Sequence, residues 1–272
     1  MTAPIPRNAF QWQDPIIFEE QLTEEERLIR DSTREFCQEK LASRILEANR
    51  NEHFDREILN EMGSIGMLGS VLPAEYGGSE TSYVGYGLMA REVERVDSGY
   101  RSAMSVQSSL VMYPIHAYGS EEQKQRFLPK LATGKIAGCF GLTEPDHGSD
   151  PGSMETRAVW ESGGYRLTGN KMWITNSTQA DYFCTLVNTG EGHHHKNKSL
   201  IIIPSKLPGI TVGGKIDKLG LRCSDTAPIF FDNVRVPKRY RIGDEGKGFT
   251  LQMKQFQEER LFVAASLLIF MD

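Results

Sequence analysis

Apolar positions in the first half of the chain recur at helical spacing. One set consists of Leu28, Ile29, Phe36, Leu41 and Ile45. Just before this set, Thr23 and Glu26 form a T-x-x-E capping box, which is typical of a helix N-terminus. The same pattern predicts helices over residues 55–67 and 83–111. A further helix begins at the S-x-x-Q box of Ser120 and Gln123 and is brought to a close by Pro129 and Gly134.

The period changes after residue 135. Short β-rich runs separated by turn residues predict strands at 136–142, 165–167, 172–174, 182–187, 200–203, 210–212 and 229–231. Seven short strands without helices between them favour an antiparallel barrel or sandwich over a dinucleotide-binding sheet. The pattern becomes helical again from about Phe249 to the last residue. The sequence therefore predicts an α+β fold with a helical domain (1–134), a β domain (135–243) and the start of a second helical domain (244–272).

The last predicted helix is apolar on more than one face. Its large side chains are Phe262, Val263, Leu267, Leu268, Ile269 and Phe270. Such a helix is expected to be buried almost all round. No later segment of this sequence could cover it.

Charge and cysteine content exclude several classes of protein. With 272 residues, a net charge of −5 and a pI near 5.8, the chain shows no sign of nucleic-acid or anionic-membrane partners. The cysteines Cys37, Cys139, Cys184 and Cys223 are far apart, so neither a disulfide framework nor a zinc site is expected. The triplet 193–195 (HHH) is expected to be a solvated loop, because three adjacent side chains cannot converge on one ion. No metal site is predicted.

The sequence offers no targeting or membrane segment. The run from Leu261 to Met271 is about half of the ~20 residues that a bilayer span needs. The first twenty residues contain one Arg and several acidic residues, unlike a secretory or transit peptide. We therefore expect a cytoplasmic protein in a bacterium, or a mitochondrial-matrix protein in a eukaryote.

Two strings carry a family resemblance. They are FGLTEPDHGSD at 140–150 and KMWITN at 171–176. Together with the order of helical and β segments, they resemble the acyl-CoA dehydrogenase family over nearly the whole chain. Residues 94–109 (ERVDSGYRSAMSVQSS) and 154–157 (METR) are similar to glutaryl-CoA dehydrogenase in particular. Beyond residue 177, the strings at 195–199, 215–220 and 257–261 look more like members that act on longer or branched acyl chains, which leaves a hybrid or a divergent lineage open.

The first string predicts a ligand-binding loop. Around Thr143, the residues Pro145, Gly148 and Ser149 offer backbone N–H groups and hydroxyls to an anionic or carbonyl-rich ligand. Each string alone could be an ordinary turn or core segment. The resemblance implies that FAD contacts Phe140, Leu142, Thr143, Gly148, Ser149, Trp173, Ile174 and Thr175. Trp173 would cover the flavin ring, and Thr175 would hydrogen-bond near its N5 atom.

A carboxylate must remove the α proton of an acyl thioester in such an enzyme. Glu259, which precedes Arg260 and Leu261, resembles the base of family members that place it on the helix opening the last domain. Glu258 points about 100° away on a helix, so both cannot serve. The alternative is that Glu258, Glu259 and Arg260 are solvated surface charges without a catalytic role. The resemblance also implies that Arg260 lines the substrate site.

A polar stripe on the predicted helix 83–111 is the candidate acyl-end site. Glu94, Ser98, Arg101 and Ser105 recur at steps of 4, 3 and 4, which places them on one helix face. An Arg fork can bind a carboxylate through two hydrogen bonds. The resemblance to glutaryl-CoA dehydrogenase implies that Glu94, Arg101 and Ser105 contact the terminal carboxylate of the substrate. Ser102 and Ser149 would also lie at the substrate site. A half-exposed ion-pair stripe is the alternative.

The resemblance implies a FAD-dependent acyl-CoA dehydrogenase. Like glutaryl-CoA dehydrogenase, it would oxidise the bond between the α and β carbons of an acyl-CoA, with or without decarboxylation to crotonyl-CoA. It would pass electrons to an electron-transfer flavoprotein and would act as a homotetramer. The family's last domain is represented here only by its first helix, so truncation is expected. The alternatives are an inactive fragment of the fold, a dehydrogenase of branched or longer acyl-CoA, and an oxygen-using relative.

Overall fold

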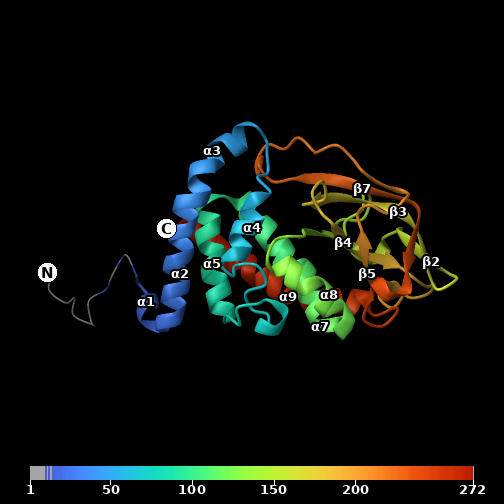
Figure 1. Cartoon of the computed structure of the whole chain (residues 1–272), viewed down its shortest axis with the longest axis horizontal. Coiled ribbons are helices and arrows are strands. Elements are labelled where there is room, and N and C mark those ends of the chain that lie inside the picture. The colour runs from blue at the N-terminus through green and yellow to red at the C-terminus, as the bar shows by residue number, and fades with distance from the viewer. Residues whose placement is uncertain (1–9, 11, 13, 272) are drawn as a thin grey trace.

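The computed structural model describes residues 10, 12 and 14–271, with helices gathered at one end and a sheet at the other (Figure 1). The helices of the first half are α1 (Phe18–Gln21), α2 (Glu24–Phe36), α3 (Ala42–Arg50), α4 (Glu57–Ser64), α5 (Tyr83–Val96), α6 (Ser98–Ser105), α7 (Tyr113–Tyr118) and α8 (Glu121–Ala132). Two π-helical turns, η1 (Cys37–Leu41) and η3 (Val106–Met112), continue α2 and α6. Short 3₁₀ turns are η2 (Ala74–Tyr76), η4 (Pro151–Ser153), η5 (Lys238–Tyr240) and η6 (Leu268–Met271).

Both predicted capping boxes are confirmed. The Thr23 hydroxyl accepts from the Glu26 backbone N–H while the Glu26 carboxylate accepts from that of Thr23, and Ser120 and Gln123 do the same at α8. The prediction that Pro129 helps to end α8 is wrong, because the helix continues to Ala132. The helix predicted over 55–67 is shorter, with bounds Glu57–Ser64.

The single helix predicted over 83–111 is broken at Asp97. This residue has extended dihedral angles (φ −161°, ψ 127°), and its side chain accepts a hydrogen bond from the Tyr100 backbone N–H. Asp is a strong N-cap because its carboxylate replaces a missing helical acceptor. Gly99 follows at the start of α6, where an added Cβ would lie 2.9 Å from the Cys223 sulfur. The apolar period thus continues across a break that a local side-chain bond creates.

The sheet contains eight strands. These are β1 (Gly138–Gly141), β2 (Arg157–Glu161), β3 (Gly164–Thr175), β4 (Tyr182–Asn188), β5 (Lys198–Pro204), β6 (Ile210–Val212), β7 (Thr226–Pro237) and β8 (Arg241–Ile242). Their order is β6-β7-β3-β2-β4-β5-β8, with β1 beside β4. The predicted α+β fold class is confirmed, with two departures: β1 and β2 each pair with β4 in parallel. Two predicted strands are parts of β3, and β2 and β8 were not predicted.

The helix α9 (Gly248–Leu267) joins the two regions. In Figure 1 it is the red helix that runs from the sheet side toward the helical end. Phe249 and Phe256 pack against the core of the sheet, whereas Phe262 belongs to the core of the helices. Burial on all sides is not observed, because Leu261 is 73% exposed and Leu267 is 46% exposed. The α9 helix therefore has a buried face that bridges the domains and an apolar face toward solvent.

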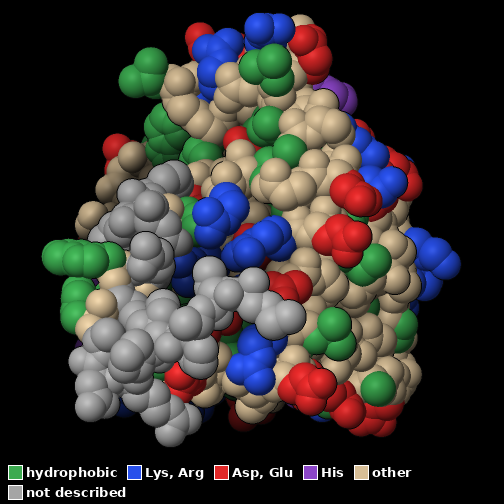
Figure 2. All heavy atoms as spheres, turned by 90° about the vertical axis from the view of Figure 1, so that its left-hand side faces the viewer, with side chains coloured by type: hydrophobic (Ala, Val, Ile, Leu, Met, Phe, Trp, Pro, Cys, Tyr) green, Lys and Arg blue, Asp and Glu red, His purple; other side chains and the backbone are tan. Residues whose placement is uncertain are grey.

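The end of the molecule formed by α2 and α3 carries mixed charge. Figure 2 shows this side, where basic and acidic side chains lie close together. Two basic side chains of these helices form ion pairs: Arg34 of α2 binds the buried Glu92, and Arg44 of α3 binds Asp55 and Glu61. Among the described residues, no helix is both long and apolar enough to cross a bilayer.

Candidate active site

The loop after β1 lies directly against β3. The Met172 backbone N–H donates to the Thr143 carbonyl at 2.8 Å, which brings the two family-like strings together. The pairing of β3 with β7 shifts register between Lys171 and Ile174. Within this irregular stretch, Trp173 has a φ of +62° and a side chain that is 56% exposed. Such backbone strain costs about 1–3 kcal/mol and persists only where the surroundings hold it.

The candidate flavin contacts form a surface with free polar groups. Among the described residues, the hydroxyls of Thr143, Ser149 and Thr175 have no hydrogen-bond partner and remain available to a ligand. Gly148 and Ser149 are exposed, and Leu142 is half-buried. Phe140 and Ile174 are buried in the sheet core, so Ile174 can offer a ligand only its backbone. An isoalloxazine ring needs hydrogen-bond donors at its edge and an apolar face, and this set of residues fits it.

A buried ion pair supports this loop from behind. The Lys171 Nζ lies 2.9 Å from Glu144 Oε1, and the side chains are 0% and 5% exposed. Burial lowers the pKa of Lys171 to about 8, although Glu144 opposes the shift. For Glu144, burial alone would raise the pKa, but Lys171 and bonds from residues 155 and 156 outweigh it and lower the pKa. Sequence reasoning missed this pair, because its partners are distant in sequence.

The polar stripe predicted on one helix is a cluster built from two. Arg101 Nε donates to Glu94 Oε2 at 2.6 Å, and Arg101 Nη1 donates to Ser105 Oγ at 3.3 Å. The Ser98 hydroxyl also donates to Glu94. Because Glu94 lies on α5 and Arg101 on α6, the prediction that these residues share one helix face is wrong. They meet across the break at Asp97, which joins the end of α5 to the start of α6.

The Arg101 guanidinium keeps one nitrogen for a further acceptor. Among the described residues, Nη2 has no hydrogen-bond partner. The guanidinium carbon lies 6.0 Å from the centre of the Phe262 ring on α9. Ser102 is half-buried on the same helix, and its carbonyl accepts from the Ser105 hydroxyl. The Arg101 cluster, defined as Glu94, Ser98, Arg101 and Ser105, could therefore accept a ligand carboxylate.

Glu259 faces the Arg101 cluster from α9. Burial raises the pKa of Glu259 to about 7, the Arg101 charge opposes that rise, and Glu258 adds to it. Its Oε2 atom is buried, and no hydrogen-bond partner is found for it among the described residues. A carboxyl whose pKa is raised by burial, beside a specific charge, is typical of a functional site. Arg260 is exposed, with its guanidinium carbon 5.7 Å from the centre of the Phe256 ring.

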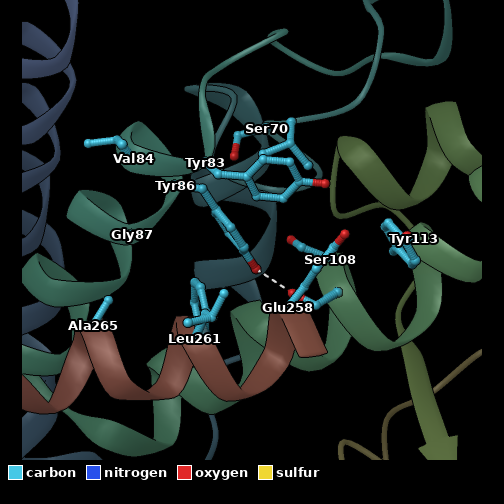
Figure 3. Close-up of a pocket in the computed structure, with 13 residues that line it drawn as sticks. Ser70, Tyr83, Val84, Tyr86, Gly87, Ser108, Tyr113, Glu258, Leu261 and Ala265 are labelled. Atoms are coloured by element: carbon cyan, nitrogen blue, oxygen red, sulfur yellow. Dashed lines mark hydrogen bonds between the residues drawn. The ribbon is translucent and has the colours of Figure 1, made fainter. Parts of the chain in front are cut away.

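Glu258 has different neighbours. It lines a cavity of about 460 Å³ between α5, η3 and α9 (Figure 3). The other lining residues are Ser70, Val71, Tyr83, Val84, Tyr86, Gly87, Ser108, Ser109, Tyr113, Leu261, Phe262 and Ala265. Burial raises the pKa of Glu258, and the nearby Tyr113 and Tyr83 hydroxyls offset part of the rise. The two adjacent carboxyls are therefore in separate environments: Glu258 lines the cavity near two tyrosines, whereas Glu259 lies near Arg101.

Tyr86 separates the cavity from the Arg101 cluster. Its hydroxyl lies 2.8 Å from the Ser109 hydroxyl, as the dashed line in Figure 3 marks. Its ring stacks on Phe262, with centroids 4.4 Å apart. Gln255 on α9 donates to the Ser109 carbonyl at 2.5 Å. The sequence did not predict site roles for Tyr86, Ser109 and Gln255, because the π-helical turn that presents Ser109 has no signature in the hydrophobic pattern.

Comparison with known proteins gives a consistent result. Residues 23–135 match the profile of the acyl-CoA dehydrogenase N-terminal domain, and residues 139–234 match that of its middle domain. An acyl-CoA dehydrogenase of Bacillus subtilis (strain 168) is 36% identical over 247 residues, which are 91% of this chain and 65% of that protein. The mitochondrial short-chain specific acyl-CoA dehydrogenase of Mus musculus is 34% identical over 248 residues, 91% of this chain and 60% of its own length.

A solved structure agrees with both profiles. The glutaryl-CoA dehydrogenase of Mycobacterium smegmatis, in complex with FADH2, superposes with a TM-score of 0.87 at 37% identity. The match covers 93% of this chain and 64% of that protein. The chain thus spans 60 to 65% of the lengths of these three relatives. Its two matched regions and this likeness show that the chain belongs to the acyl-CoA dehydrogenase family.

Proposed function

We propose that the protein containing this chain is a FAD-dependent acyl-CoA dehydrogenase that prefers a short acyl-CoA ending in a carboxylate, such as glutaryl-CoA. The observation that carries the proposal is the buried, unpaired Glu259 oxygen beside the Arg101 cluster. One group can take a proton, and the other can hold an anion. This pairing is what α,β-dehydrogenation of a dicarboxylic thioester requires.

Each residue has a distinct task in this proposal. Glu259 removes the α proton, and its raised pKa makes it a stronger base than an exposed carboxylate. Arg101 holds the far carboxylate through its free Nη2 atom, while Glu94 fixes the orientation of the guanidinium. Thr143, Ser149, Thr175 and Trp173, with Leu142, Gly148 and Phe140, would hold FAD. Bound FAD supplies the acceptor for the hydride that leaves the β carbon.

A second candidate is a dehydrogenase of uncharged short or branched acyl-CoA. It is favoured by the cavity in Figure 3, whose lining is mostly apolar and which a hydrocarbon chain could fill. The 34% identity to a short-chain specific enzyme of Mus musculus supports it as well. In this case Arg101 would serve the fold by pairing with Glu94, and the acyl chain would end elsewhere. An electron-transfer flavoprotein is the proposed electron acceptor in either case.

Anaerobic flavin bleaching tests the proposal. The protein is mixed with FAD and then with glutaryl-CoA or pentanoyl-CoA, which have five carbons and differ in the terminal carboxylate. We expect glutaryl-CoA to bleach the flavin faster. Analysis of the product for crotonyl-CoA decides whether carbon dioxide is lost. Faster bleaching by pentanoyl-CoA would select the second candidate, and no bleaching by either thioester would contradict both.

A further inference from the structure

The pair Lys171 and Glu144 connects three segments at the candidate flavin surface. Lys171 Nζ donates to the Leu142 carbonyl at 3.0 Å and to Glu144 Oε1 at 2.9 Å. Glu144 also accepts from the backbone N–H groups of Glu155 at 2.6 Å and Thr156 at 3.0 Å. The loop after β1, the segment before β2 and the strand β3 are therefore joined at one buried point.

We infer that Lys171 and Glu144 are positioning residues that hold the Thr143 loop and Trp173 in the arrangement that receives the flavin ring. The inference rests on the proposed function for its ligand. Neither side chain can touch the ring itself, because Lys171 is 0% exposed and Glu144 is 4% exposed. They act through their neighbours: Leu142 and Thr143 on one side of the contact, and Met172 and Trp173 on the other.

The strained backbone at Trp173 shows why an anchor is needed. A Trp with φ of +62° adopts a left-handed conformation that bulky residues avoid, and it persists only if surrounding bonds hold it. Lys171 lies two residues before it, and the bond from Met172 N–H to the Thr143 carbonyl lies between them. Losing the Lys171 anchor would free the strand to relax toward regular pairing with β7. Trp173 would then lose its outward orientation.

A substitution series separates positioning from general stability. Lys171→Met keeps the length of the side chain and removes its charge and donors. The double variant Lys171→Met with Glu144→Gln also removes the buried carboxylate charge that the single change leaves unpaired. Arg34→Met is the matched control in the helical region. It removes the two hydrogen bonds, each 3.0 Å long, that Arg34 donates to the buried carboxylate of Glu92.

Three measurements are made on each protein. Hydrogen exchange without flavin follows peptides covering residues 142–149, 154–157 and 171–175. A titration with FAD gives Kd and the visible circular dichroism of bound flavin, and urea denaturation gives the unfolding midpoint. For Lys171→Met we expect at least tenfold faster exchange in these peptides, a Kd at least tenfold higher and a changed dichroism band. The double variant should regain the unfolding midpoint but not the exchange protection or the affinity. Arg34→Met should lower the midpoint and leave these peptides and Kd unchanged.

The outcomes distinguish this inference from the proposed function. If the unmodified protein binds no FAD but Lys171→Met speeds exchange only in the three peptides, the pair positions the loop and the flavin proposal fails. If Lys171→Met leaves both exchange and Kd unchanged, the inference is overturned. It is overturned as well if the double variant regains affinity together with stability, or if Arg34→Met weakens FAD binding equally. In the last two cases, the pair stabilises the fold but does not position the flavin-binding segments.

Discussion

The Arg101 cluster and the Lys171–Glu144 pair are both buried ion pairs, but only one of them is saturated. Glu144 accepts bonds from Lys171 and two backbone N–H groups, and Lys171 donates to two oxygens and contacts the Met154 sulfur. In the Arg101 cluster, Nη2 has no hydrogen-bond partner among the described residues, and the adjacent Glu259 has a buried oxygen without one. Buried polar atoms normally have partners, so unpaired ones need an explanation.

This difference separates holding from binding. In a saturated pair, every donor and acceptor already has a partner, so none is left for a ligand. Such a pair can only fix the segments that it joins. An unsaturated cluster carries a free-energy cost that a ligand with matching groups relieves. The helical region would therefore bind the acyl end of the substrate, and the sheet would hold the flavin-binding segments in place.

Removing a member of the saturated pair should cost the most stability. Glu144→Ala leaves Lys171 buried without its carboxylate and two backbone N–H groups without acceptors. Breaking a buried pair in this way typically costs about 3–5 kcal/mol in the free energy of unfolding. Urea denaturation measures it. Glu161→Ala, which breaks an exposed pair with Arg166, should leave the midpoint nearly unchanged, and equal losses would remove the distinction.

Glu259→Gln should abolish flavin reduction by the acyl-CoA and leave the fold intact. Loss of a general base typically lowers the rate by about 10²–10⁴-fold. Glu258→Gln is the matched control, because Glu258 lines the cavity on the other side of the helix from the Arg101 cluster and its loss should matter far less. Rapid-mixing spectroscopy follows the flavin band. Comparable rates in the two variants would contradict the assignment of the base.

The pH dependence should identify the same carboxyl. Because burial raises the pKa of Glu259 to about 7, the rate of flavin reduction should rise with pH through about 7. A carboxyl with a raised pKa stabilises the fold below its ordinary pKa of 4.5, and that stability is lost as pH rises through 7. The unmodified protein should therefore lose stability across this window relative to Glu259→Gln. A pH-rate profile that is flat between about pH 6 and about pH 8, roughly one unit on either side of this pKa, would exclude Glu259 as the base.

The sequence predicted the local features of this fold well. Thr23 with Glu26 and Ser120 with Gln123 lie three residues apart, so their caps depend only on nearby chain. It missed the break at Asp97, because the apolar period runs through that position and one side-chain bond overrides it. It missed β2, whose burial pattern does not alternate clearly. The Lys171–Glu144 pair joins residues 27 apart, and nothing in either string marks the contact. The Arg101 cluster was predicted with the right residues but the wrong geometry.

Arg101→Ala should change substrate preference more than overall rate. Losing the proposed contact with a terminal carboxylate typically costs a few kcal/mol, which corresponds to a loss of about 30-fold or more for glutaryl-CoA. Pentanoyl-CoA lacks the carboxylate and should lose much less. The measurement is the ratio of kcat/KM for the two thioesters in each protein. Equal losses on both would mean that Arg101 serves the fold by pairing with Glu94, which is what the second candidate function requires.

Tyr86→Phe is the smallest change and probes the wall between the cavity and the Arg101 cluster. The variant keeps the stack on Phe262 and removes only the hydroxyl that meets Ser109. Losing one such bond typically costs about 0.5–1.5 kcal/mol. Tyr165→Phe, which removes the hydroxyl bonded to Arg241 in the sheet, is the control for stability. If Tyr86 borders the substrate site, only Tyr86→Phe should also raise KM, because Tyr86 lines the cavity beside Glu258, whereas Tyr165 binds Arg241 in the sheet. An identical KM in both variants would place Tyr86 in the core and outside the site.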